Sequence, residues 1–210
     1  MRIRITFSKQ GALRYTGHLD LHKLWERAAR RAELPLAYSQ GFHPQPKMNI
    51  AAALPLGFSS RCEVLDMRLE QDIQLDGLAV KLNDTMPEGI RVTQIEQVDE
   101  RAPALQTQVA SAEYEVTLKE AGLGSDLKRK IDSIMESESI IRTRRNKEYD
   151  LRPLVETLTL IPSPDGKKEK IFMKLTAKEG ATGRPEEVLD VLGIAFEETR
   201  IERVRLNFQS

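Results

Sequence analysis

The sequence predicts an α+β fold, with antiparallel sheets that are covered by helices on one face. The first observation is that hydrophobic periodicity changes along residues 1–98 in the order strand, helix, strand, strand, helix, strand. The second is that residues 111–210 follow the same order more loosely, without a residue-level repeat. Between them, DERAPALQTQ (Asp99–Gln108) has no periodicity and contains a proline, as linkers do. We therefore predict two tandem ferredoxin-like (βαββαβ) domains, 1–98 and 111–210, joined by a linker over 99–110.

The first half opens with a strand and a helix. Apolar and polar side chains alternate in Met1–Phe7, as they do in a half-buried strand. A helix is predicted from Asp20 to about Leu34, with Asp20 as its cap and Pro35 ending it. Its apolar face recurs at helical spacing and consists of Leu21, Leu24, Trp25, Ala28 and Ala32.

The remaining elements follow from the same two periodicities. In the first half, strands are predicted at Met48–Ala53, Glu63–Leu69 and Ile90–Val98, and a helix at Leu75–Met86 that Pro87 and Gly89 stop. The second half should contain two helices, Asp126–Met135 and Glu186–Leu192, the latter after Pro185. Its predicted strands are Tyr114–Leu118, Ile140–Arg144, Thr157–Ile161, Ile171–Thr176 and Arg200–Phe208.

Composition narrows the class of protein. The chain has 210 residues, 40% of them hydrophobic, which suits one domain or two small ones. No apolar run reaches the ~18 residues that span a bilayer, and the amino terminus alternates, so we expect a cytoplasmic protein that does not contact a membrane. The single cysteine, Cys62, excludes an internal disulfide and a thiolate-held cluster, and we expect no cofactor.

Charge is unevenly distributed, although the net charge is zero. Residues 1–47 carry nine basic and three acidic side chains, whereas residues 48–120 carry six basic and thirteen acidic ones. A molecule polarised in this way can hold a polyanion on one side, while a solvated helix face is the commoner meaning of such a run.

The candidate RNA-binding surface combines a basic helix face with an irregular loop, SQGFHPQPK (Ser39–Lys47). Cations for phosphate and rings for base stacking are the combination that single-stranded RNA requires. The alternative is a solvated helix face, with Phe42 packed under its loop. The candidate residues are Lys23, Arg27, Arg30, Arg31, Tyr38, Phe42, His43 and Lys47.

A second basic cluster comprises Arg142, Arg144, Arg145 and Lys147. These residues either extend the RNA-binding surface or protect a charged edge strand from aggregation.

The three histidines permit two further hypotheses. His18 and His43 are candidates for general acid and base in a metal-independent endoribonuclease, if the loop folds back over the start of the helix. A metal site formed with His22 is the other possibility, but His18 precedes the expected cap and no carboxylate lies at a typical ligand spacing. We therefore predict no metal site.

The block from His18 to Met67, which contains HLDL and GFHPQPK, resembles the opening block of the radical-SAM-linked proteins, an uncharacterised bacterial family. That family also tends to carry a later Arg-Pro element, which two segments of this chain resemble, DLRPL (Asp150–Leu154) and GRPEEVLDVLG (Gly183–Gly193). The family occurs beside or fused to cobalamin-binding-type radical S-adenosylmethionine enzymes, and its gene neighbours suggest RNA as the substrate.

The resemblance implies a partner and not a reaction. The radical enzyme needs a three-cysteine motif that this chain lacks. The sequence and the resemblance together predict a non-catalytic RNA-binding accessory protein that works with a radical S-adenosylmethionine enzyme in RNA modification or processing. The alternatives are the endoribonuclease and a protein–protein adaptor.

Overall fold

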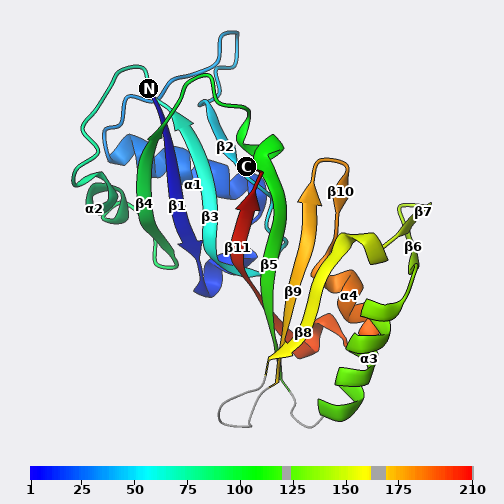
Figure 1. Cartoon of the computed structure of the whole chain (residues 1–210). Helices are drawn as coiled ribbons and strands as arrows, with labels where there is room; N and C mark the ends of the chain where they lie inside the picture. The colour runs from blue at the N-terminus through cyan, green and yellow to red at the C-terminus, as the bar shows by residue number, and fades with distance from the viewer. Residues whose placement is uncertain (120–123, 162–168, 210) are drawn as a thin grey trace. The chain divides into compact units, whose positions relative to one another are not determined.

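The computed structural model describes residues 1–119, 124–161 and 169–209. The chain is a mixed α+β protein with mostly antiparallel strand pairing, and its described residues include four α-helices (Figure 1). It divides into two compact units, Met1–Val109 and Ala110–Ser210. None of the helices in the described ranges is long and apolar enough to cross a membrane.

The first unit contains a four-stranded sheet in the order β2-β3-β1-β4, with every neighbouring pair antiparallel. Ile5 at the centre of β1 lies opposite Leu65 of β3 on one side and Ile95 of β4 on the other. In chain order the elements are β1 (Arg2–Lys9), α1 (His18–Arg31), β2 (Met48–Ile50), β3 (Ser59–Arg68), α2 (Leu78–Asn83) and β4 (Ile90–Val98). The short 3-10 helices η1 (Gly11–Tyr15) and η2 (Leu105–Gln108) complete the unit.

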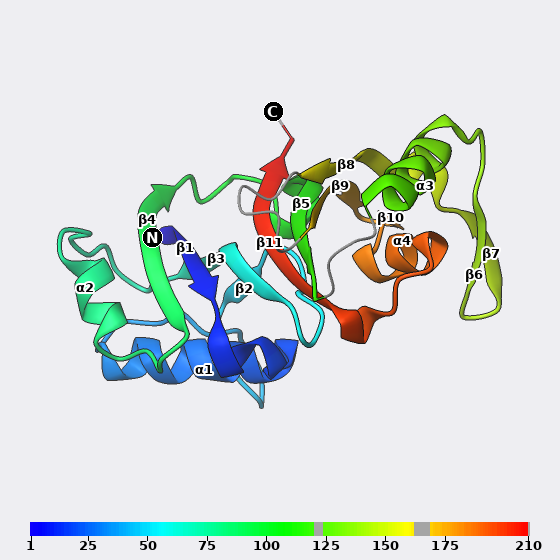
Figure 2. The same ribbon diagram turned by 90° about the horizontal axis from the view of Figure 1, so that it is seen from below.

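Both helices of the first unit pack on the same face of its sheet. Trp25 of α1 is fully buried and meets Phe7 of β1 edge to face, with ring centroids 4.8 Å apart. Leu78 and Leu82 of α2 belong to the same hydrophobic core. Figure 2 shows α1 running beneath the strands of this unit. The opposite side of α1 is therefore left to solvent.

The structure corrects the limits of both predicted helices in this unit. Helix α1 begins at His18 and is capped by Gly17, whose backbone is extended, so Asp20 lies in the first turn and is not the cap. Helix α2 begins only at Leu78, because Gly77 adopts a left-handed φ of 75°. Asp20 still lies where a carboxylate stabilises the helix dipole.

A buried ion cluster lies on β1 and β3. The Asp66 carboxylate accepts hydrogen bonds from Arg2 Nε at 3.0 Å and from Arg4 Nε at 2.8 Å. Arg2 also donates to the carbonyl oxygens of Ala102 and Pro103, at 2.7 and 2.9 Å. Arg2 and Asp66 are almost fully buried. The cluster therefore holds the segment after β4 against the sheet.

In the second unit, β9 pairs with β8 and β10 on one side and with β5 on the other, and β11 follows β5. Met173 of β9 lies opposite Tyr114 of β5 and Leu158 of β8. The strands are β5 (Val109–Leu118), β6 (Ile141–Arg144), β7 (Lys147–Asp150), β8 (Val155–Ile161), β9 (Lys170–Lys178), β10 (Ala181–Thr182) and β11 (Thr199–Phe208). The helices are α3 (Gly124–Glu136) and α4 (Pro185–Leu192), with short 3-10 turns η3 (Arg152–Leu154) and η4 (Phe196–Glu198).

The DLRPL segment has a structural role in this unit. The Asp150 carboxylate accepts the backbone N–H groups of Ile140 and Arg152, at 2.8 and 2.9 Å. The Arg152 guanidinium donates to the carbonyl oxygens of Met135, at the end of α3, and Val155, at the start of β8. The arginine thus satisfies a helix-end carbonyl that would otherwise lack a partner.

Candidate nucleic-acid interface

The loop between α1 and β2 is closed at its base by backbone hydrogen bonds. Ser39 N donates to the Gln45 carbonyl at 2.8 Å, and Gln45 N donates to Ser39 Oγ at 2.9 Å. Lys47 N donates to the Ala37 carbonyl at 2.8 Å, and Tyr38 bridges to Pro46. These contacts fix the base of the loop, and its tip projects beyond the strands of the unit (Figure 1).

Phe42 stands at the tip of this loop and is fully exposed, with a relative accessibility of 103%. It therefore does not pack under the loop, which was the structural alternative to a binding role. A large apolar ring held in solvent on a closed loop offers a face for stacking.

One flank of α1 faces the base of the loop across a hollow of about 350 Å³. Arg30 lies on this flank, where its Nε donates to the Tyr38 hydroxyl at 3.1 Å and its guanidinium pairs with Glu26 at 2.9 Å. The helix contributes His18, Leu19, His22, Lys23 and Glu26 to the hollow, and the loop and β2 contribute Gln45, Pro46 and Met48.

The other flank of α1 borders a second hollow, of about 450 Å³. Arg31 lies here and donates to the backbone carbonyl of Thr85. The lining residues are Thr16, Asp20, Lys23, Leu24, Arg27, Arg31 and Pro87. Lys23 therefore lines both hollows and lies on the exposed surface of α1 between them.

The four cations of α1 consequently differ in their partners. Arg30 and Arg31 have acceptors within the unit, whereas Lys23 and Arg27 are exposed and have no hydrogen bond or ion pair to any described residue. An anion that binds this surface meets the charges of Lys23 and Arg27 without first breaking a contact. The sequence alone could not make this distinction, because Tyr38 and Thr85 come from outside the helix.

The structure brings His18 together with His22 and leaves His43 apart. The His18 and His22 rings meet edge to face, with centroids 4.8 Å apart. Both line the hollow beside the loop, whereas His43 lies in the exposed tip and is not a lining residue. Across the described part of the chain, no group of three or more histidine, cysteine, aspartate or glutamate side chains is placed to hold a metal ion.

The electrostatic environment of His22 predicts an unusual titration. Burial lowers the pKa of His22 below its ordinary value of 6.5, and the nearby His18 lowers it further. We expect the His22 Hε1 signal to titrate below that value in an NMR pH series. The substitution His18→Gln should raise the pKa only part of the way, because the burial remains.

The matched control for this titration is His43→Gln, which removes the histidine at the loop tip and should leave the His22 curve unchanged. The lowered pKa of His22 also makes the folding stability of the chain depend on pH. Since the folded chain binds this proton less readily than the unfolded chain, His22 reduces stability as the pH falls below about 6.5. A His22 that titrates above its ordinary value would contradict the arrangement.

The fold and this surface define an α+β protein that presents a cationic helix beside a projecting loop. The family described as "Uncharacterized protein conserved in bacteria (DUF2344)" matches residues 2–185. The chain belongs to this family. A search of curated proteins finds no match. The family description names no activity and no partner, so the association with radical S-adenosylmethionine enzymes stays a prediction.

Proposed function

We propose that the chain is an RNA-binding accessory protein, and that RNA binds along the exposed side of α1 and the adjoining loop. The observation that carries the proposal is the pair of uncompensated cations on the exposed side of α1, Lys23, which lines both hollows, and Arg27, which lines the second. Cations of this kind supply the phosphate contacts that dominate RNA affinity. The exposed Phe42 ring adds a stacking platform on the same unit.

The proposed architecture is a tandem pair of ferredoxin-like domains, 1–98 and 111–210, with 99–110 as the linker. Its support is the strand order, which is β2-β3-β1-β4 in the first unit and β8-β9-β5-β11 in the second. In each unit the first strand, β1 or β5, is central. The second strand of the sheet, β2 or β8, pairs antiparallel with the third, β3 or β9, and lies at the edge, as expected for a βαββαβ motif.

The proposed partner is a radical S-adenosylmethionine enzyme in RNA modification or processing. Its iron–sulfur cluster must be held by the partner, because the one cysteine of this chain, Cys62, cannot ligate a cluster alone. In this arrangement the α1 surface presents the RNA and the partner supplies the chemistry, in the cytoplasm.

The test is the double substitution of Lys23 and Arg27 by alanine, with binding to labelled single-stranded RNA measured by fluorescence anisotropy over a salt series. Loss of two phosphate contacts should weaken binding on the order of tenfold and flatten the salt slope by about 1.4, since each contact to a single strand contributes roughly 0.7. The matched control replaces Lys128 and Arg129 of α3, two cations that are paired with Asp132 and Asp126.

A further arm of this test separates stacking from charge. Phe42→Ala removes a ring that makes no core contact, so the fold should be unaffected. Binding should weaken by about 1–3 kcal/mol with no change in salt slope. If the Lys23/Arg27 variant and Phe42→Ala both bind as wild type does, the RNA-binding role of this surface is refuted.

An endoribonuclease is the second candidate, supported by the placement of His18 and His22 in one hollow. The acid–base pair predicted from the sequence is His18 with His43, and His43 does not line that hollow. Incubation of the chain with total RNA and a chelator distinguishes the two functions. Discrete fragments that disappear with His18→Ala or His22→Ala would establish the enzyme, whereas binding without any product supports the accessory role.

A further inference from the structure

The strands β6 and β7 form a separate two-stranded hairpin in the second unit, outside the main sheet. Its turn places Arg145 and Asn146 at positive φ, 49° and 61°, as a type I′ turn requires. Such turns favour Asn and Gly, so an arginine in this conformation is locally unfavourable. Figure 1 shows the hairpin extending from the second unit.

Two of the four basic residues in this hairpin anchor it to α4. Arg144 Nε donates to Glu187 Oε1 at 2.7 Å, and the Arg144 guanidinium also lies 4.7 Å from the centre of the Tyr149 ring. Arg142 forms an ion pair with Asp190. An isolated two-stranded hairpin is marginally stable in water, so these ion pairs help to hold it in place. The charges of Arg142 and Arg144 are therefore already neutralised by Asp190 and Glu187.

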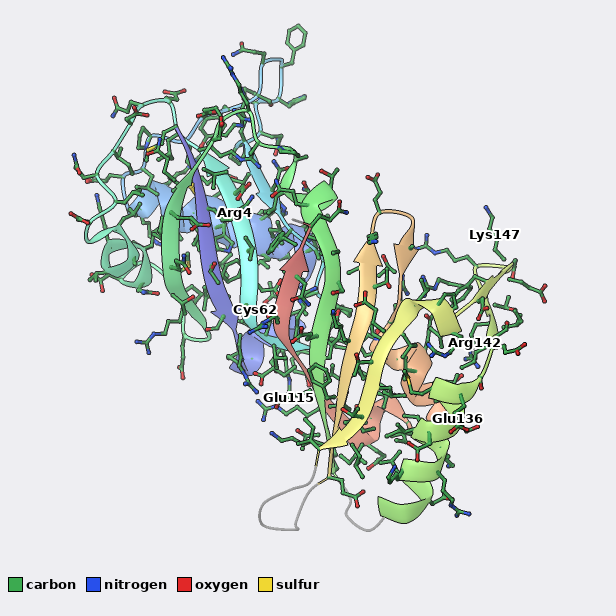
Figure 3. The ribbon with its side chains drawn as sticks, viewed as in Figure 1. Arg4, Cys62, Glu115, Glu136, Arg142 and Lys147 are labelled. Atoms are coloured by element: carbon green, nitrogen blue, oxygen red, sulfur yellow. The ribbon has the colours of Figure 1, made fainter. Side chains whose placement is uncertain are left out.

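The other two basic residues, Arg145 and Lys147, remain available. Both are exposed, and within the described ranges neither forms a hydrogen bond or an ion pair through its side chain. Figure 3 shows the Lys147 side chain extending away from the hairpin, whereas Arg142 lies toward the helices. The tip of the hairpin thus offers two uncompensated cations and the Asn146 amide, with no large apolar side chain among the three.

We propose that the β6–β7 hairpin is a second contact for the sugar–phosphate backbone of RNA, made by Arg145 and Lys147 on an arm that Arg142 and Arg144 hold in place. A protein partner is a poorer fit, because the tip lacks the aromatic or aliphatic anchor that dominates protein interfaces. The ligand class rests on the proposed RNA-binding function, but the site is separate.

The test uses the full chain with Arg145 and Lys147 both replaced by alanine, and labelled single-stranded RNA over a salt series. We expect affinity to fall on the order of tenfold and the salt slope to flatten by about 1.4, as for two phosphate contacts. The charge-preserving exchange of Arg145→Lys with Lys147→Arg should retain the wild-type slope. The Lys128/Arg129 alanine variant is the matched control, because it removes the same charge from helix α3 of the same unit, where both cations are paired with carboxylates.

The outcomes separate this inference from the proposed function. If the Arg145/Lys147 variant binds as tightly and with the same slope as the control, the hairpin does not contact RNA, even where the Lys23/Arg27 variant is impaired. If neither double variant differs from wild type and Phe42→Ala also binds as wild type does, both proposals fail. Circular dichroism and thermal melts of each variant exclude loss of folding as the cause of weaker binding.

Discussion

Replacing Asp66 by asparagine is expected to destabilise the first unit by about 3–5 kcal/mol, the usual cost of breaking a buried ion pair from one side. The change leaves two arginines without their counter-charge. Arg2 is almost fully buried and keeps its contacts to the Ala102 and Pro103 carbonyls. Asparagine retains one acceptor oxygen and faces the arginines with an NH2 donor in place of the other, so it can accept only part of the hydrogen bonds that Arg2 and Arg4 donate to the carboxylate. The segment after β4 should loosen at the same time.

Denaturant unfolding followed by tryptophan fluorescence measures this effect in the intact chain. Trp25 is the only tryptophan and is fully buried in the first unit, so its emission reports on that unit. The control is Glu33→Gln, which breaks the solvent-exposed pair with Lys81 in the same unit. An exposed pair contributes little, so the control should change stability by less than about 1 kcal/mol. Equal midpoints for the two variants would show that the Asp66 cluster is not stabilising.

Sequence periodicity located most elements because local burial decides them. Ile3, Ile5 and Phe7 alternate in the sequence and are all fully buried in β1, and Trp25 lies on the buried face of α1 as its spacing predicted. Ile90–Val98 is a strand with the predicted limits. The secondary structure of these segments can be predicted from nearby residues alone, because alternation and helical spacing are local patterns in the sequence.

The polar interior could not be predicted in this way. Asp66 alternates with Leu65 and Met67, which suggests a solvent-facing position, yet it is 3% exposed because Arg2 and Arg4 cover it. Those arginines lie more than sixty residues away in the chain. Only the pairing of β1 with β3 brings the three side chains together.

The same limit applies to the candidate site. The basic stripe of α1 was visible from its spacing, but the two arginines that have acceptors could not be told from the two cations that do not. The hairpin at Arg145 was also missed, because its turn carries Arg-Asn where a sequence signal expects Asn-Gly. The segment Ile140–Arg144 therefore appeared to be a strand of the main sheet, whereas β6 pairs only with β7 among the described strands.

Replacing Gly89 by alanine is expected to destabilise the first unit by about 3 kcal/mol or more, the sum of backbone strain and overpacking. Gly89 has a φ of +99°, a conformation that residues with a Cβ rarely adopt. An added Cβ would lie 2.6 Å from the Gln10 carbonyl oxygen, which belongs to the backbone and cannot rotate away. The Gln10 backbone N–H meanwhile donates to the Gly89 carbonyl at 2.7 Å, so the two segments cannot separate without losing that bond.

Gly77→Ala separates the two contributions, because Gly77 also has a left-handed φ, +75°, but no atom lies within 4 Å of an added Cβ. Its cost should be confined to the backbone conformation, about 1–2 kcal/mol. Both variants are measured by the same Trp25 unfolding assay, and the difference between them gives the cost of the contact with Gln10. If Gly89→Ala costs no more than Gly77→Ala, the chain relaxes at this turn and the close approach of Gln10 to Gly89 does not constrain the unit. If the difference is large, the turn beside Pro87 is rigid. Pro87 lines the same hollow as Arg27 and Arg31, so this side of the hollow is then preorganised before any ligand binds.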